Sequence, residues 1–297
     1  MANELVQGLG WFVRRTADGQ QWPLAEFYER ALGMRGVRPP PKPPLANKML
    51  WTGDIAMFEL SVRTAGAEGE ARQGDTIPVF RARNFDGARD RIRAAGGTLH
   101  DESPGMPRYM QFKDPDGFLF GITEPPAGSP YPSDQMADAL WQRGAVELPG
   151  IEKFGPELQD IASIIVKVAD PTAMANFYAE AIGLDLYMPP GAGGAVLGLG
   201  RTVSLTLRPG GQRRDAPDDR QIIPDVWILR VRDIKAMTAR LKSKGVNVVN
   251  EMTINGGALV YAVDPEGHLF GLQQRTLDLY KEGVPVRIED KVVWALG

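Results

Sequence analysis

Two stretches decide the fold: Ala25-Glu-Phe-Tyr-Glu-Arg-Ala-Leu-Gly-Met34 and Ala175-Asn-Phe-Tyr-Ala-Glu-Ala-Ile-Gly-Leu184, which match at an offset of 150 residues (175 − 25). At the same offset, Lys113-Asp-Pro-Asp-Gly-Phe-Leu-Phe-Gly121 matches Val263-Asp-Pro-Glu-Gly-His-Leu-Phe-Gly271. Between these blocks, residues 85–96 match residues 234–245. Three matching blocks in one order indicate that the chain is a duplication.

Each copy alternates between strand-like and helix-like periodicity. Runs rich in β-formers at 9–15 and 161–168 precede helical patterns that end at Gly33 and Gly183, where a helix C-cap favours positive φ. The sequence then predicts strands at 55–62 and 202–207, and a second strand–helix pair at 77–81 with 85–95 and at 226–231 with 234–244. The Asp-Pro-Asp-Gly and Asp-Pro-Glu-Gly segments predict type I turns between two final strands. Each copy therefore reads as two βαβββ units.

The repeat boundaries predict four segments. We expect a first module at 1–128, a linker with a short helix at 129–157, a second module at 158–275 and a C-terminal tail at 276–297. The linker is rich in Pro and Gly, which is typical of a connection between domains. The tail alternates apolar and charged residues, so it is expected to add a strand or a subunit contact, with a homodimer as one possibility.

The composition excludes several classes of function. The chain has 297 residues, 43% of them hydrophobic, no cysteine and a net charge of −3. Without cysteine there are no disulfides, thiolate metal sites or cysteine nucleophiles. No basic stripe indicates a nucleic-acid partner, and no apolar run is long enough for a membrane span. We therefore expect a cytoplasmic protein whose partner is a small amphipathic organic molecule.

The duplicated pattern resembles the vicinal oxygen chelate superfamily, which includes glyoxalase I, extradiol ring-cleaving dioxygenases and bleomycin-binding proteins. The similarity covers residues 8–124 and 159–274. It implies an α+β fold of two tandem modules, each a pair of βαβββ units that form a curved, mostly antiparallel sheet with the helices on its outside.

The resemblance also identifies the positions that hold a metal ion in the superfamily's enzymes. In this sequence they fall on Trp11, Glu59, Ile77 and Gly121 in the first module and on Ser163, Ser204, Val226 and Gly271 in the second. Of these residues, only Glu59 resembles a ligand of a transition metal. The only two histidines, His100 and His268, lie away from these positions and are expected at the surface or in loops. The prediction is therefore a protein without a metal ion or other cofactor.

A site of organic side chains is the remaining expectation. Glu59 is the candidate base, and Trp11, Phe58 and Tyr109 are expected to surround its carboxylate and raise its pKa. Tyr109 or Arg15 would stabilise developing negative charge. The candidate substrate-binding residues are Trp11, Ile77, Gly121, Ser163, Lys167 and Tyr261, with Gly121 leaving room for a ligand against the backbone.

Two functions remain open from the sequence. The first is a metal-independent lyase or isomerase of small-molecule catabolism that acts on an aromatic or carbonyl compound by acid–base chemistry. The alternative is a protein that binds and sequesters a small molecule unchanged, as resistance proteins of the superfamily do. A ring-cleavage dioxygenase or a glyoxalase-type metalloenzyme is less favoured.

Overall fold

A computed structural model describes the chain over the following residues: 6–36, 48–51, 57–62, 75–82, 84–103, 108–124, 158–191, 193–199, 203–215, 225–254, 257–275, 286–288 and 291–293. The short helix predicted within the linker lies outside the described residues. The boundaries of the four predicted segments stay a prediction.

The first half of the chain contains two βαβββ units. The first has β1 (Val6–Thr16), α1 (Gln21–Leu32), β2 (Arg35–Gly36), β3 (Lys48–Trp51) and β4 (Met57–Val62). The second has β5 (Thr76–Ala82), α2 (Phe85–Ala94), β6 (Thr98–Ser103), β7 (Tyr109–Lys113) and β8 (Leu119–Thr123).

The second half repeats this order. Its first unit has β9 (Leu158–Val168), α4 (Pro171–Phe177), a π-helical turn η1 (Tyr178–Ile182), β10 (Asp185–Gly191), β11 (Gly194–Leu199) and β12 (Val203–Pro209). Its second unit has β13 (Asp225–Val231), α5 (Ile234–Ser243), β14 (Asn247–Ile254), β15 (Gly257–Val263) and β16 (Leu269–Arg275). In the tail, β17 (Val286–Ile288) and β18 (Lys291–Val293) pair with each other.

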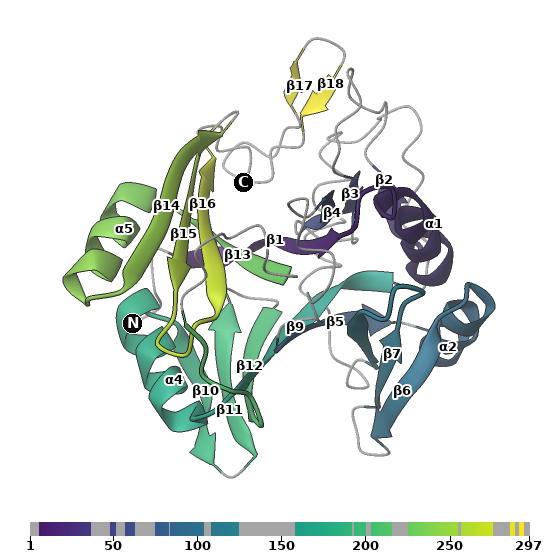
Figure 1. The fold of residues 1–297 in the computed structure, drawn as a ribbon, viewed down its shortest axis with the longest axis horizontal. Coiled ribbons are helices and arrows are strands. Elements are labelled where there is room, and N and C mark those ends of the chain that lie inside the picture. The colour runs from purple at the N-terminus through teal and green to yellow at the C-terminus, as the bar shows by residue number, and fades with distance from the viewer. Residues whose placement is uncertain are drawn as a thin grey trace.

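The four units form two curved eight-stranded sheets. Sheet A has the order β14-β15-β16-β13-β1-β4-β3-β2, and sheet B has the order β10-β11-β12-β9-β5-β8-β7-β6. In Figure 1 the sheets are two arches set back to back, one open toward the top and one toward the bottom, with α1 and α2 on one flank and α4 and α5 on the other. The predicted α+β fold of two sheets, each built from a pair of βαβββ units, is confirmed.

The sheets do not follow the sequence halves, however. Sheet A joins the first unit of the first half to the second unit of the second half through the antiparallel pair β1 and β13. Sheet B joins the other two units through β5 and β9. The expected arrangement, with both units of one copy in one sheet, is wrong, because the four central strands share one alternation of side chains and that pattern does not select a partner.

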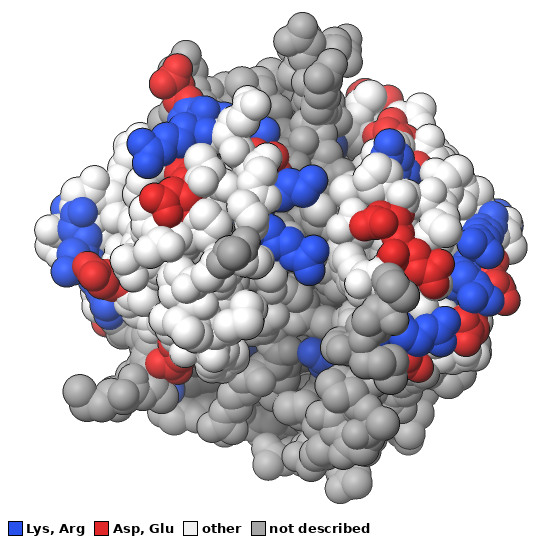
Figure 2. Space-filling view, turned by 90° about the horizontal axis from the view of Figure 1, so that it is seen from below, with Lys and Arg blue, Asp and Glu red and all other residues white. Residues whose placement is uncertain are grey.

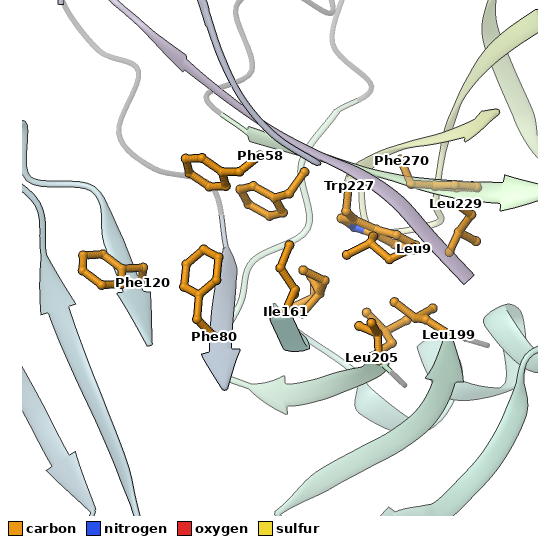
Figure 3. Close-up of a cluster of buried hydrophobic side chains, with 14 of the residues drawn as sticks. Leu9, Phe58, Phe80, Phe120, Ile161, Leu199, Leu205, Trp227, Leu229 and Phe270 are labelled. Carbon is orange, nitrogen blue, oxygen red and sulfur yellow. The ribbon is translucent and has the colours of Figure 1, made fainter. Parts of the chain in front are cut away.

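The main core lies between the backs of the two arches. Figure 3 shows its aromatic and aliphatic side chains, which come from both sheets. Within the first half, Phe58 of β4 meets Phe80 of β5 with ring centroids 5.9 Å apart. Within the second half, Tyr178 meets Trp227 of β13 at 5.7 Å. Side-chain packing therefore holds together the two units of each half, and the halves are connected by the shared core and by the backbone hydrogen bonds of the two sheets.

The predicted helix ends and turns are confirmed. Gly33 and Gly183 follow the first helices with φ of 68° and 86°. The Gly117 N–H donates to the carbonyl of Asp114 over 2.9 Å, and the Gly267 N–H donates to that of Asp264 over 3.0 Å. Among the described residues, no helix is long and apolar enough to cross a membrane.

Candidate functional site

Each arch presents a concave face on the side away from the core. On sheet A this face, the A face, consists of Trp11, Val13, Glu59, Val226, Ile228, Leu259, Tyr261, Val263 and Leu269. On sheet B the corresponding B face consists of Ile77, Val79, Tyr109, Gln111, Leu119, Ser163, Ile165, Thr206 and Arg208. The candidate residues of the sequence analysis are thus divided between two faces.

The A face holds Glu59 and Arg15 as close neighbours. The strand register sets Glu59 beside Val13, two residues before Arg15 on the same face of β1. Both side chains are buried, with 7% of Glu59 and 5% of Arg15 exposed. Trp11 and Tyr261 lie on this face too, in one apolar cluster.

The expected surroundings of Glu59 are wrong in two respects. Phe58 points to the opposite side of β4, where its ring stacks on Phe12 at 5.8 Å in the main core. Tyr109 belongs to sheet B. Neighbouring residues of a strand point to opposite sides of the sheet, which separates Phe58 from Glu59. Tyr109 was expected near Glu59 because both belong to the first half of the sequence. The structure therefore brings Glu59 together with Arg15 and Trp11, but not with Tyr109.

The side chains at the superfamily's metal positions do not fit a metal ion. On sheet A these positions are Trp11, Glu59, Val226 and Gly271, and on sheet B they are Ile77, Gly121, Ser163 and Ser204. Glu59 is the one carboxylate among them. The indole, aliphatic groups, hydroxyls and glycines at the other positions are not the donor set of a transition metal. Among the described residues, no three His, Cys, Asp or Glu side chains gather as a ligand group.

The space beside Gly121 is filled, contrary to expectation. A Cβ at Gly121 would lie 2.8 Å from Cε2 of Tyr109, so the tyrosine ring rests on the glycine. At the equivalent position on the A face, a Cβ at Gly271 would lie 2.7 Å from Cγ1 of Ile228. A side chain of this protein, rather than an open space, therefore occupies each position.

The B face combines an apolar floor with half-buried polar groups. Ile77, Val79 and Ile165 form the floor and are at most 3% exposed. The Ser163 hydroxyl donates to the carbonyl of Ser204 over 3.1 Å and lies 2.9 Å from the Thr206 hydroxyl. Since Ser163 has one proton, Thr206 must donate to it. Both hydroxyl protons are then used, so the oxygens of Ser163 and Thr206 can only accept a hydrogen bond from a ligand.

Tyr109 supplies the complementary donor. The Gln111 amide donates to the Tyr109 hydroxyl over 2.7 Å, so the phenol keeps its own proton for another partner. Burial raises the pKa of Tyr109, although the Gln111 hydrogen bond and the charge of Arg208 oppose this shift. The phenol therefore stays protonated at neutral pH.

Arg208 reaches across the whole B face. It lies on β12, which is four strand spacings of about 4.8 Å from β7 in the sheet order. Its Cζ nevertheless lies 5.8 Å from the centroid of the Tyr109 ring, a cation–π distance. The arch therefore brings its two arms within reach of each other above the apolar floor.

Lys167 of β9 is the direct neighbour of Arg208. The two residues are partners in the parallel register of β9 and β12, and both are exposed. The loop after β12 holds this end of the sheet in place, because the Gly211 N–H donates to the carbonyl of Val168 and Arg214 pairs with Asp75 over 2.8 Å.

A second tyrosine stands on the opposite arm of sheet B. Tyr187 of β10 is 60% exposed, and a Cβ at Gly198 would lie 2.4 Å from its Cζ. Gly198 pairs with Ser204, whose neighbour Thr206 belongs to the B face. The sheet therefore carries a tyrosine ring seated on a glycine near each of its two edges.

The two histidines differ from each other. His100 is exposed on β6, at the edge of sheet B. His268 lies in the turn between β15 and β16, as expected of a loop residue, but only 7% of it is exposed. Its Nδ1 lies 2.9 Å from the buried carboxylate of Asp264, which also accepts a 2.6 Å hydrogen bond from Tyr178. Since the carboxylate needs a partner away from water, this contact explains the burial.

Comparison with known proteins relates part of the chain to a family and the whole chain to a known fold. Residues 163–273 match the family described as the glyoxalase-like domain. Glyoxalase I from Zea mays is 17% identical over 93% of this chain and 95% of that chain, with a TM-score of 0.64. A search of curated proteins finds no match.

Two Streptomyces sp. CB03234 proteins match a shorter part of the chain. A glyoxalase/bleomycin resistance protein is 31% identical over 37% of this chain and 96% of that chain, with a TM-score of 0.29. An antibiotic-binding protein is 29% identical over 39% of this chain and 96% of that chain, with a TM-score of 0.30.

The chain shares its fold with glyoxalase I, and its residues 163–273 match the glyoxalase-like domain family. Three polar residues of the B face were missed from the sequence: Gln111, Thr206 and Arg208. The signal for two of them was present, because Ser204, Thr206 and Arg208 alternate with Val203, Leu205 and Leu207 along β12. That alternation places all three polar side chains on one face of the strand.

Proposed function

We propose that the B face binds a small amphipathic molecule with an aromatic or carbonyl group. The observation that carries the proposal is the polar set of Tyr109, Gln111 and Arg208 above the buried floor of Ile77, Val79 and Ile165. Small-molecule sites are mostly apolar with a few precisely placed polar groups. The A face fits this description less well, because its polar residues Glu59 and Arg15 are buried, whereas Tyr109 and Gln111 are half-buried and Arg208 is exposed.

The chemistry of each group defines the complementary ligand. The Tyr109 O–H donates to a carbonyl or phenolate oxygen, while Ser163 and Thr206 accept from an N–H or O–H group. Aromatic rings favour offset or edge contacts with other rings, so Tyr109 and Tyr187 provide aromatic surface on the two arms. The ligand therefore carries polar groups at two points and an apolar body between them.

Substitution of Tyr109 tests this assignment. Tyr109→Ala removes both the ring and the donor, so the affinity for aromatic carbonyl compounds falls by about tenfold or more. Tyr109→Phe keeps the ring and gives a smaller loss. The measurement is isothermal titration calorimetry with a panel of such compounds, and Trp11→Phe on the A face is the matched control. Equal affinities for wild type and Tyr109→Ala would refute binding at the B face.

A second candidate function is favoured by one observation on the A face, namely a buried carboxylate next to an arginine. In this function Glu59 abstracts a proton next to a carbonyl group, and Arg15 stabilises the oxyanion that forms. Return of the proton to another carbon is an isomerase reaction, and loss of a leaving group is a lyase reaction. Neither step draws on a metal ion.

Glu59→Gln tests the enzymatic candidate. The amide keeps the shape of the side chain but cannot take a proton, so turnover falls by at least about a hundredfold while binding is retained. The measurement is mass spectrometry of each bound compound before and after incubation. Recovery of every ligand unchanged from the wild-type protein would reject the enzyme and leave sequestration as the function.

A further inference from the structure

Two cationic side chains, Lys167 and Arg208, lie side by side on the B face. Lys167 and Arg208 are register partners on adjacent strands, with side chains on the same face of the sheet. Like charges at directly opposed positions destabilise a sheet. In the described part of the chain, no ion pair links either side chain to a carboxylate.

Two carboxylates near this end of β9 are engaged elsewhere, and a third, Asp101, lies on the other arm of the sheet, where its charge acts on Tyr109. Asp75 accepts the Lys167 N–H through its backbone carbonyl, but its carboxylate pairs with Arg214 over 2.8 Å. The Asp170 carboxylate caps α4 by accepting the N–H groups of Thr172 and Ala173. Neither of these first two carboxylates therefore forms an ion pair with Lys167 or Arg208. Figure 2, which is seen from below, shows basic side chains near the middle of the view and acidic side chains to their right.

A third donor points to the same place. Arg208 extends over the ring of Tyr109, whose hydroxyl already accepts from Gln111 and has its own proton left to donate. A guanidinium, an ammonium and a phenolic O–H are donors that an oxyanion accepts, and charge-assisted bonds of this kind are the stronger ones.

We propose that the ligand of the B face is an aromatic anion, with a carboxylate or similar oxyanion held by Lys167, Arg208 and Tyr109. This inference rests on the proposed function and specifies its substrate class. The aromatic body lies over Ile77, Val79 and Ile165, and the anionic group lies at the end of the face where β9 and β12 finish. Neither the overall charge of −3 nor the fold implies a preference for an anionic ligand over a neutral one.

A matched pair of probes tests the proposal. 1-Naphthoate and 1-naphthamide have the same aromatic body and differ in charge, and calorimetry gives the affinity of the full-length protein for each. We expect 1-naphthoate to bind at least about tenfold more tightly, and this preference to shrink with added salt. In the double variant Lys167→Gln and Arg208→Gln the preference disappears, because the affinity for 1-naphthoate falls by more than the affinity for 1-naphthamide.

A control variant and three possible results separate the anion proposal from the proposed function. The double variant Arg93→Gln and Lys235→Gln removes the same charge from exposed positions on α2 and α5 and keeps the preference. Equal wild-type affinities for the two probes, both reduced by Tyr109→Ala, would overturn the anion but leave the proposed function standing. Equal losses for both probes in the Lys167 and Arg208 variant would also overturn the anion. Binding of neither probe at millimolar concentrations would overturn both.

Discussion

At the scale of single residues, each half contains a buried aspartate at the same position of the repeat, Asp114 or Asp264, and the two aspartates have different cationic partners. In the first half Asp114 accepts a 2.8 Å hydrogen bond from Tyr28 and pairs with Arg14 of β1, whose guanidinium lies over the ring of Phe118. The segments Val13-Arg-Arg-Thr-Ala-Asp18 and Ile165-Val-Lys-Val-Ala-Asp170 align Arg14 with Val166. The cation of the second half is instead His268, at the position of Phe118.

This exchange of cations makes stability depend on pH in the second half. Burial lowers the pKa of His268, but the hydrogen bond and charge of Asp264, with Asp75 and Glu266, outweigh it and raise the pKa above its ordinary value. Arg214 also lies near this cluster and pairs with Asp75. Because the folded state binds the proton more tightly, the stabilisation is complete below the unfolded pKa of about 6.5 and is lost as pH rises through the raised folded value.

Urea denaturation from about pH 6 to about pH 9 measures this effect. The free energy of unfolding of the wild-type protein should fall across the range. His268→Phe should be less stable by a few kcal/mol at about pH 6, because Asp264 loses its cation, and its stability should vary less with pH. A wild-type decline that persists undiminished in His268→Phe would assign the titration to another group.

At the scale of elements, the sequence predicted most of the structure because local signals are strong. The expected helix at 85–95 is observed as Phe85–Ala94, where the Asn84 side chain accepts the Gly87 N–H, and the expected strand at 226–231 is observed as Asp225–Val231. The candidate site was predicted less well. Lys167, Arg208 and Tyr109 do lie on one face, but Arg208 reaches Tyr109 only through the curvature of sheet B, which local periodicity does not encode.

At the scale of the whole molecule, the exchange of units between the sheets determines which candidate residues meet. Trp11 lies opposite Ile228, and Ile77 lies opposite Ile165, so both faces are built from both halves. The partner of each central strand is set by contacts between segments far apart in the chain, and the duplication makes two partners look equally suitable. For this reason the sequence could not assign Glu59 and Tyr109 to different faces.

Engineered disulfides test the exchange directly, because the natural chain has no cysteine. Val13 and Val226 are antiparallel register partners, and opposed residues have Cα atoms about 4.5–5.5 Å apart, within the range of a disulfide. The variant with cysteine at both positions should oxidise to a cross-linked species that migrates differently on a non-reducing gel. Cysteines at Val13 and Ile77, which one sheet per sequence half would bring together, should stay reduced. Cross-linking of the second pair alone would contradict the exchanged sheets.

The central claim is that the B face is the ligand-binding surface of this protein, and a crystal structure with 1-naphthoate bound tests it most directly. The account predicts the naphthalene ring against Tyr109 and the apolar floor of Ile77 and Val79, with the carboxylate within hydrogen-bond distance of Lys167 and Arg208. Density for the compound beside Trp11 and Glu59 on the A face, with the B face empty, would contradict it.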